Sequence, residues 1–375
     1  MDDVMDEICA RLKIRDLLNV GLVCKRWHAA MSRELARRGR PERALIPDPS
    51  DRRLAEANFH VLDFLSDRPH VSILFVGPSK RERENSMKNA ELTILNRYGG
   101  YLHKHVVAVG VDQCVEDQSD IKSCQGLLGP ANGILGLFLP LSRNFRINVD
   151  VIDLNYHGYW NADTDYNNRS FLQNLLPENK AEKSTLLIFA RPHTDSGGVL
   201  RCIKANCPAR TYSLWGGSFD DDLLFMPPLG RRSRHGIREA AFVGVNIYGP
   251  NIQSWSTVID CRIHERQFNE RLLRFRDALA LRRHTIGLAC GPRYVENFVS
   301  EVTDYIKNGT LIMGAVKSVF PTIPFIGAFN YGYHAHFGVD SESDDPNQNL
   351  STEMSLSLLI ITYDHCGTID QDVEN

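Results

Sequence analysis

The feature that most constrains this chain is a series of short apolar runs, each ending in glycine or at a polar cluster. Clear examples are "HVSILFVG" at 70–77, "HVVAVGVD" at 105–112, "STLLIFA" at 184–190 and "TYSLWGG" at 211–217. Each run has the length of a strand and falls far short of the ~18 residues that a membrane-spanning helix needs. The sequence therefore predicts buried strands and gives no reason to expect a membrane as partner.

Helical patterns alternate with these runs. "SGGVLRCIKANC" at 196–207 and "FNERLLRFRDALALRR" at 268–283 are predicted helices, and the second is amphipathic. The segments 133–153 and 240–260 each combine an apolar strand, a short turn and a second strand, so we expect two hairpins. Residues 156–168 are predicted to form a polar loop. The alternation of buried strands with flanking helices favours an α+β class with a mixed α/β body.

The first 40 residues differ from the rest because they carry a helical pattern. Val4, Ile8 and Leu12 recur every four residues, as on one face of a helix. Asp16 is a candidate cap for a second helix, and "CKRWHAAMSRELARRG" at 24–39 predicts a third. Pro41, Pro47 and Pro49 then indicate a linker.

Composition narrows the class of protein. The 375 residues are 43% apolar and 24% charged, which is ordinary globular usage, and the formal net charge is -3. This balance gives no reason to expect nucleic acid or an anionic membrane as the main partner. The nine cysteines form no framework, and the acidic start lacks the basic region of a signal peptide. We therefore expect reduced thiols in the cytosol or nucleus.

The N-terminal segment carries more apolar side chains than so small a unit can bury. A segment of roughly 40 residues or fewer rarely stabilises itself without a metal, a disulfide or a partner. Leu17, Leu18, Leu22 and Val23 cannot all face one interior, and Trp27 belongs to a residue type favoured as an interface anchor. Two interpretations stay open: the helices contact another chain, or they dock on the body of their own chain.

The segment "DDVMDEICARLKIRDLLNVGLVCKRW" resembles the F-box, mainly through its ending Val23-Cys24-Lys25-Arg26-Trp27. The Leu-Pro pair that opens most F-boxes is missing, so we expect either a short first helix or a different start of the chain. The resemblance implies binding to the Skp adaptor and, through it, to cullin. The residues that it implicates in adaptor binding are Val4, Met5, Ile8, Leu12, Leu17, Leu18, Val20, Leu22, Val23 and Trp27.

The rest of the chain is similar to the FIST domain. The similarity follows the order of "STLLIFA", "TYSLWGGSFDD", "EAAFVGVNIYG", "HTIGLACG", "VFPTIPFIGAFNYG" and "LSLLIITYDHCG". FIST domains are proposed sensory modules for small ligands. The two resemblances together imply an F-box at 1–40, a linker with first elements at 41–69, a FIST N-like lobe at 70–230 and a FIST C lobe at 231–375.

The predicted recognition site lies on glycine-rich segments that follow apolar strands, because loops at strand ends carry function on a rigid scaffold. The residues assigned to substrate or ligand binding are Gly216, Gly217, Asp220, Asp221, Cys290, Arg293, Asn330 and His334. For Cys290, a buried structural thiol is the favoured alternative. A second alternative is that the segments 216–222, 290–293 and 330–336 are ordinary turns and that targets bind a helical face elsewhere.

No catalytic, metal or cofactor site is predicted. Phosphate-binding loops and zinc-binding motifs are absent from the sequence. His193, Asp195 and Ser196 are adjacent in sequence, whereas a catalytic triad is assembled in space, so a loop with a helix cap explains them better. A solvated turn explains the run Asp220–Asp222 better than a cation site, and the pair His334 and His336 lacks identifiable further ligands for a metal.

Two functions follow from these patterns. The first is a non-catalytic substrate-recognition subunit of an SCF (Skp–cullin–F-box) E3 ubiquitin ligase, which binds protein substrates for ubiquitination and degradation in the cytoplasm or nucleus. The second is a small-ligand-sensing FIST protein with a degenerate F-box that does not dock.

Overall fold

The computed structural model describes most of the chain. The described residues are 2–37, 41–47, 65, 69–76, 105–111, 113–116, 133–140, 145–153, 164–178, 182–192, 194, 196–208, 211–219, 223–226, 238–292, 309–330, 335–341, 343, 345 and 348–364. Every structural statement that follows concerns these residues.

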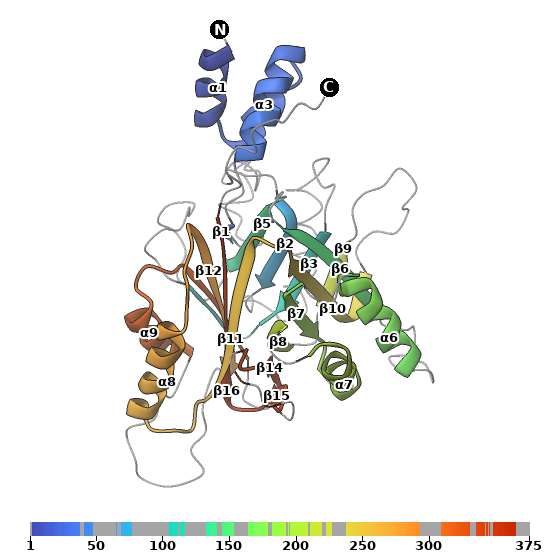
Figure 1. Cartoon of the computed structure of the whole chain (residues 1–375), viewed down its shortest axis with the longest axis vertical. Coiled ribbons are helices and arrows are strands. Elements are labelled where there is room, and N and C mark those ends of the chain that lie inside the picture. The colour runs from blue at the N-terminus through green and yellow to red at the C-terminus, as the bar shows by residue number, and fades with distance from the viewer. Residues whose placement is uncertain are drawn as a thin grey trace.

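Three helices form a small N-terminal unit that stands at one end of the molecule, above the sheets (Figure 1). They are α1 (Asp2–Arg11), α2 (Ile14–Val20) and α3 (Lys25–Arg37). Asp16 is not the cap of α2, because the helix begins at Ile14 and its N-cap is Lys13, which makes no side-chain capping bond. Asp16 lies instead in the first turn of α2, where its negative charge complements the positive end of the helix dipole.

The body contains two sheets. The larger has eleven strands, in spatial order β1 (Glu42–Pro47), β5 (Gly133–Pro140), β2 (Pro69–Val76), β3 (His105–Gly110), β9 (Leu223–Met226), β10 (Arg238–Tyr248), β7 (Ser184–Ala190), β8 (Tyr212–Ser218), β14 (His336–Gly338) and β15 (Ser351–Thr352), with β6 (Arg146–Asp153) paired to β10. The smaller has five strands, in the order β11 (Ile252–Asp260), β16 (Ser355–Tyr363), β12 (His284–Pro292), β13 (Phe325–Asn330) and β4 (Gln113–Glu116).

Four layers stack in the order helices, small sheet, large sheet, helices (Figure 1). Helices α8 (Glu265–Asp277) and α9 (Gly309–Val319) cover the small sheet, and α6 (Thr164–Leu175) and α7 (Ser196–Asn206) cover the large one. The central core fills the space between the sheets, where residues such as Phe189 and Leu288 are fully buried. This arrangement confirms the predicted α+β class, with a small helical unit followed by a mixed α/β body.

Serine and threonine hydroxyls join the two sheets across part of this core. Thr185 of β7 donates to the Ser254 hydroxyl of β11 at 2.8 Å, and Ser254 donates to the Ser213 hydroxyl of β8 at 3.1 Å. The Leu214 N–H donates to the Ser256 hydroxyl at 3.2 Å. Because the groups are buried, each bond removes a polar atom that would otherwise be unsatisfied.

Neither of the two predicted hairpins forms. β5 pairs with β1 and β2 while β6 pairs with β10, and β10 pairs with β6, β7 and β9 while β11 pairs with β16. The connection at Gly249, whose φ is +152°, is followed by Pro250, and it carries the chain from the large sheet into the small one. A short turn between two strands therefore marks a change of sheet here, and the sequence pattern is the same for both outcomes.

The other strand and helix predictions agree with the structure in type. The strands at 70–77, 105–112, 184–190 and 211–217 correspond to β2, β3, β7 and β8. The helix predicted at 268–283 is α8, which begins and ends earlier. Helix α6 begins inside the segment that was predicted to be a polar loop, and α9 was not predicted.

The predicted domain boundaries stay predictions, but the sheets exchange strands across them. β4 lies in the range assigned to the first lobe and pairs with β13 in the small sheet. β14, from the second range, pairs with β8 in the large sheet. β1 lies in the predicted linker and pairs with β5.

Candidate functional site

The N-terminal unit is held together by a small apolar core and one ion pair. Met5, Cys9, Leu17 and Met31 belong to its buried core. The Arg33 guanidinium of α3 donates to both carboxylate oxygens of Asp6 on α1, with Nη2–Oδ1 at 2.7 Å and Nε–Oδ2 at 3.1 Å. These contacts fix α1 against α3, so the unit presents its outer surface in a defined arrangement.

Four apolar side chains of this unit face solvent. Val4 is 59% exposed, Ile8 41%, Leu22 83% and Val23 68%. They are four of the seven large apolar side chains of the described residues that are exposed, although the unit holds only a tenth of the chain. Single exposed apolar side chains are common on protein surfaces, but this share is high for so short a segment.

The local structure explains why these four are exposed. Val4 and Ile8 are four residues apart on α1 and therefore share one helix face. Leu22 and Val23 lie in the turn that follows α2, where their N–H groups donate to Asn19 O at 3.0 Å and Val20 O at 3.1 Å. The turn points both side chains away from the core that Leu17 occupies five residues earlier.

The ten residues predicted to bind the adaptor thus divide into three groups. Val4, Ile8, Leu22 and Val23 are exposed, Leu12, Leu18, Val20 and Trp27 are half-buried, and Met5 and Leu17 are buried within the unit itself. Met5 and Leu17 are 8% and 0% exposed, so they hold the helices together rather than offering a contact surface. The sequence did not distinguish these groups, because all ten positions are equally apolar.

The unit also contacts the body. The Ile14 N–H donates to Leu65 O at 3.3 Å, and Ile14 and Leu65 are both buried. The apolar cluster that includes them continues to Leu74 and Val106 on the large sheet. Both interpretations of the N-terminal segment therefore have structural counterparts: part of it docks on the body, and part of it faces outward.

The described members of the predicted recognition site do come together. The Cys290 thiol at the end of β12 donates to Gly216 O on β8 at 2.9 Å, and the Asn330 side chain at the end of β13 donates to Ser218 O at 3.2 Å. Asp220, Asp221, Arg293 and His334 lie outside the described residues. The ends of β8, β12 and β13 therefore lie close together, and the role of this region in recognition stays a prediction.

These converging residues are buried, however. Cys290 is 0% exposed and Asn330 1%. Burial raises the pKa of the Cys290 thiol, so the thiol stays protonated, and its hydrogen bond to Gly216 O satisfies it. A neutral, enclosed thiol neither contacts a protein target nor acts as a nucleophile.

Gly216 and Gly217 serve packing between strands rather than the approach of a ligand. Gly216 has φ +142°, and a Cβ there would overlap the carbonyl of Ile188 on the neighbouring strand. A Cβ on Gly217 would lie 2.8 Å from Ala335 O. The glycines are required where β8 passes between β7 and β14, which is a structural reason for their presence.

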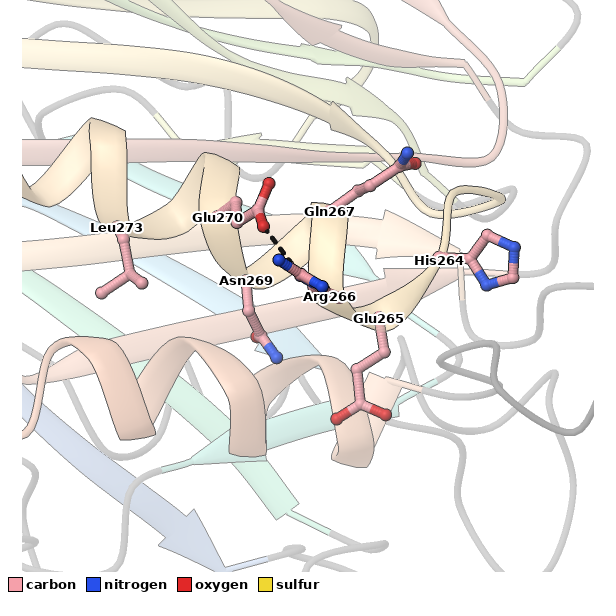
Figure 2. A pocket seen from close by; sticks show the side chains of 7 residues that line it. All are labelled: His264, Glu265, Arg266, Gln267, Asn269, Glu270 and Leu273. Atoms are coloured by element: carbon pink, nitrogen blue, oxygen red, sulfur yellow. Dashed lines mark hydrogen bonds and ion pairs between the residues drawn. The ribbon is translucent and has the colours of Figure 1, made fainter.

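Two surface grooves were not predicted from the sequence. One lies along the N-terminal half of α8, has a volume of about 780 Å³ and is lined by His264, Glu265, Arg266, Gln267, Asn269, Glu270 and Leu273 (Figure 2). Its Arg266 and Glu270 form an ion pair at 3.1 Å, so their charges cancel. Pairing of this kind is typical of a solvated helix surface.

The second groove lies between α6 and α7 and has a volume of about 690 Å³. Arg169, Leu172 and Leu176 belong to one wall, and Gly198 and Arg201 to the other. The groove could not be predicted from the sequence, because α6 begins inside the predicted polar loop and its opposite wall is a separate helix, α7. Only the tertiary structure brings the two helices side by side (Figure 1).

Neither a metal-binding cluster nor a membrane-spanning helix is found in the described part of the chain. No group of three or more His, Cys, Asp and Glu side chains lies close enough to hold a metal ion. None of the helices combines the length and the apolarity that crossing a bilayer requires.

Comparison with known proteins gives a match to one family model and matches to several solved structures, two of which are described here. Residues 2–39 match the F-box-like family model, which is the range of α1, α2 and α3. No curated protein matches the chain. A solved structure of cyanuric acid hydrolase from A. caulinodans matches at 9% identity and a TM-score of 0.43, over 87% of this chain and 99% of that one. A second cyanuric acid hydrolase structure matches at 9% identity and a TM-score of 0.37, over 86% and 99%.

Proposed function

We propose that this chain is the substrate-recognition subunit of an SCF E3 ubiquitin ligase, and that it recruits target proteins for ubiquitination and proteasomal degradation. One observation supports the proposal most directly. The residues that match the F-box-like model include four of the seven exposed large apolar side chains of the described residues. An F-box binds the Skp adaptor, and an apolar surface of this kind is what a protein partner would cover.

The exposed residues take the direct role in this proposal. Leu22 and Val23 on the turn, with Val4 and Ile8 on α1, would lose their contact with water on binding the adaptor. Trp27 is half-buried and would contribute the part of its ring that remains accessible. Leu17 and Met5 would act indirectly, by keeping α1, α2 and α3 in place.

The chain contributes binding rather than chemistry in this proposal. Ubiquitin transfer belongs to the other subunits, which the adaptor and cullin would bring to a target held on the body. The body, whose sequence segments resemble those of the FIST domain, would supply the target-binding surface. We expect the chain to work without a cofactor, in the cytoplasm or the nucleus.

The test is direct binding of purified Skp adaptor to the full chain, measured by titration calorimetry. Burying a Leu or Val contributes about 1.5–3 kcal/mol, and every 1.4 kcal/mol changes the dissociation constant tenfold. We expect Leu22→Ala and Val23→Ala each to weaken binding by about 10-fold or more. Leu311→Ala is the matched control, because Leu311 is a 53% exposed leucine on α9.

The outcomes separate the two functions. Equal binding by the Leu22→Ala/Val23→Ala variant and the wild type would contradict the direct contact. Failure of the wild type to bind an adaptor that does bind another F-box protein would instead favour a small-ligand sensor with a degenerate F-box. Loss of adaptor binding by Leu311→Ala as well would indicate general instability, and the Leu22→Ala and Val23→Ala results would then no longer support a direct contact.

A further inference from the structure

Strand β6 forms an edge of the large sheet, and its outer side has no partner strand among the described residues. It pairs with β10 alone and lies beside α6 (Figure 1). None of its residues is buried: Arg146 and Asp153 are exposed and those between them are half-buried, whereas every residue of β7 is buried. Strand β6 therefore keeps access to solvent along its whole length.

The hydrogen bonds of β10 show which backbone groups of β6 point outward. Ala241 O of β10 accepts a bond from the residue that follows β7, so every second residue from Ala241 onward faces β7 and those between face β6. The residues that face β6 lie opposite its even-numbered residues, which leaves the N–H and C=O groups of Ile147, Val149 and Val151 directed outward. The Asp150 carboxylate accepts a bond from the Val151 N–H, which agrees with this direction.

Strand β11, at an edge of the small sheet, differs because its outer side is closed. Ser256 of β11 donates its N–H to Ser341 Oγ at 3.0 Å, and Ser341 donates its N–H to Ser256 O at 3.0 Å. Within the described ranges, no such bond reaches the backbone of Ile147 or Val149 from outside the sheet. An open edge of this kind is a template for another strand.

The backbone of β6 fits a second copy of itself in an antiparallel register. When Val149 lies opposite Val149 of the second copy, Ile147 lies opposite Val151. All three residues have outward backbone groups, so each pair can exchange both N–H···O bonds. Their side chains pack against the central core, so the added strand extends one apolar face. A slip by one residue would place residues with outward groups opposite residues without them.

The side chains on the other face of β6 also match in this register. Asn148 lies opposite Asp150 of the second copy, and Arg146 lies diagonal to that same Asp150, within reach of a long side chain. Arg146 is exposed and forms no ion pair with another described residue. The Asn174 side chain donates to Asp150 at 3.0 Å and holds the carboxylate on this face. A register that placed Asp150 opposite Asp150 would bring like charges together and is disfavoured.

We propose that β6 is a dimerisation edge, to which a second copy of this chain adds its own β6 antiparallel, with Arg146 of each copy paired to Asp150 of the other. The Val151 N–H would then exchange its bond to Asp150 for one to Ile147 O of the second copy. Two-fold symmetry makes every such contact twice, which suits a self-complementary edge. The inference goes beyond the proposed function, because the edge lies outside the N-terminal unit and needs no adaptor.

The test is analytical ultracentrifugation of the full chain at concentrations from about 1 µM to about 100 µM, because interfaces of small area associate weakly. We expect a reversible equilibrium between monomer and dimer. Arg146→Glu should raise the dissociation constant of the dimer by about 10-fold or more, since both Arg–Asp contacts become repulsive. Arg274→Glu is the matched control and should dimerise as the wild type does, because Arg274 is an exposed arginine on α8.

A second variant acts on the backbone. Val149→Pro removes an outward N–H and leaves the pairing with β10 intact, and proline is tolerated on an edge strand. It should abolish the dimer while the circular dichroism spectrum stays that of the wild type. Hydrogen exchange of the wild type should show the amides of Ile147 and Val149 protected at high concentration and exchanging quickly at low concentration. Should Val149→Pro fail to fold, Arg146→Glu and the exchange measurement decide.

Three results would overturn the proposal. The first is a wild-type chain that stays monomeric over the whole concentration range. The second is a dimer that Arg146→Glu and Val149→Pro leave unchanged, or in which the β6 amides stay unprotected, because the interface would then lie elsewhere. The third is a monomer whose β6 amides become protected only when a target protein binds, which would assign the edge to a foreign strand.

Discussion

The N-terminal unit and the body differ in how far their apolar side chains are exposed to solvent. In the unit, Leu22 and Val23 are 83% and 68% exposed, whereas in the body every residue of β7 and β16 is buried. A small unit has too little interior for all its apolar groups, while four stacked layers can enclose whole strands. The exposed side chains of the unit and the enclosed strands of the body should therefore respond differently to reagents and to substitutions.

The largest contrast should appear in thiol reactivity. Cys24 is exposed in the turn before α3, and Cys290 is buried in the body with its pKa raised by burial. A thiol reagent should modify Cys24 rapidly in the folded chain, and Cys290 only as fast as the body opens. Because opening of a core costs several kcal/mol, we expect rates that differ by roughly a thousandfold or more. Mass spectrometry of each cysteine checks this, and comparable rates would contradict the burial of Cys290.

The next effect concerns the core of the body. Trp215 is fully buried, packs edge-on against Phe75 and Phe189, and donates from Nε1 to Ser357 O at 3.2 Å. Trp215→Ala should lower the free energy of unfolding by about 3–5 kcal/mol, through the lost burial and the cavity that remains. Urea denaturation measures the change. A loss below about 1 kcal/mol would mean that the two sheets are not packed as described.

Within the N-terminal unit, Leu17 and Leu22 should separate folding from binding. Leu17→Ala should destabilise α1, α2 and α3 by about 2–5 kcal/mol, because Leu17 is fully buried there. Hydrogen exchange of these helices in the full chain should accelerate for Leu17→Ala and stay unchanged for Leu22→Ala. Both variants should lose affinity for the adaptor, the first through unfolding and the second through the contact itself. Equal exchange in the two variants would remove the distinction.

The ion pair between α1 and α3 should contribute less to the stability of the N-terminal unit than the buried Leu17 does. The Arg33 and Asp6 side chains are 44% and 19% exposed, so water screens part of their attraction. Arg33→Ala should cost less than about 1 kcal/mol in the stability of the unit, as is usual for pairs near the surface. The same exchange measurement checks it, with Arg26→Ala as a control on an exposed arginine of α3.

The smallest effect is a pH dependence in the body. Burial raises the pKa of Asp150 above its ordinary value of 3.8, although the bond from Asn174 partly offsets this. The folded chain then holds this proton more tightly than the unfolded one, so this contribution to stability falls as pH rises from about 3.8 through the folded pKa. Asp150→Asn should remove that fall and slightly stabilise the chain at neutral pH. Denaturation of both proteins at pH 4 and pH 7 tests it, and identical slopes with pH would contradict the assignment.

The sequence predicted most elements but not their partners. Apolar runs at 184–190 and 211–217 are long enough to be strands and too short for spanning helices, so local pattern settled their type. The two expected hairpins were wrong because consecutive strands with this pattern can pair with other strands: β5 and β6 have different partners in the large sheet, and β10 and β11 lie in different sheets. Helix α6 was missed because "TDYNNRSFLQNL" is polar over its first half and shows its apolar face only at Phe171, Leu172 and Leu175.

For the candidate sites, too, the sequence and the tertiary structure supplied different information. The sequence alone showed that residues 1–40 carry more apolar groups than so small a unit can bury and that they resemble the F-box, because composition and motifs are local properties. Only the tertiary structure decided that Leu17 turns inward and Leu22 outward, and that Cys290 and Gly216 meet inside the core. It also placed Arg169 and Arg201 on facing walls of one groove. Burial and proximity depend on residues far apart along the chain, and no local pattern contains that information.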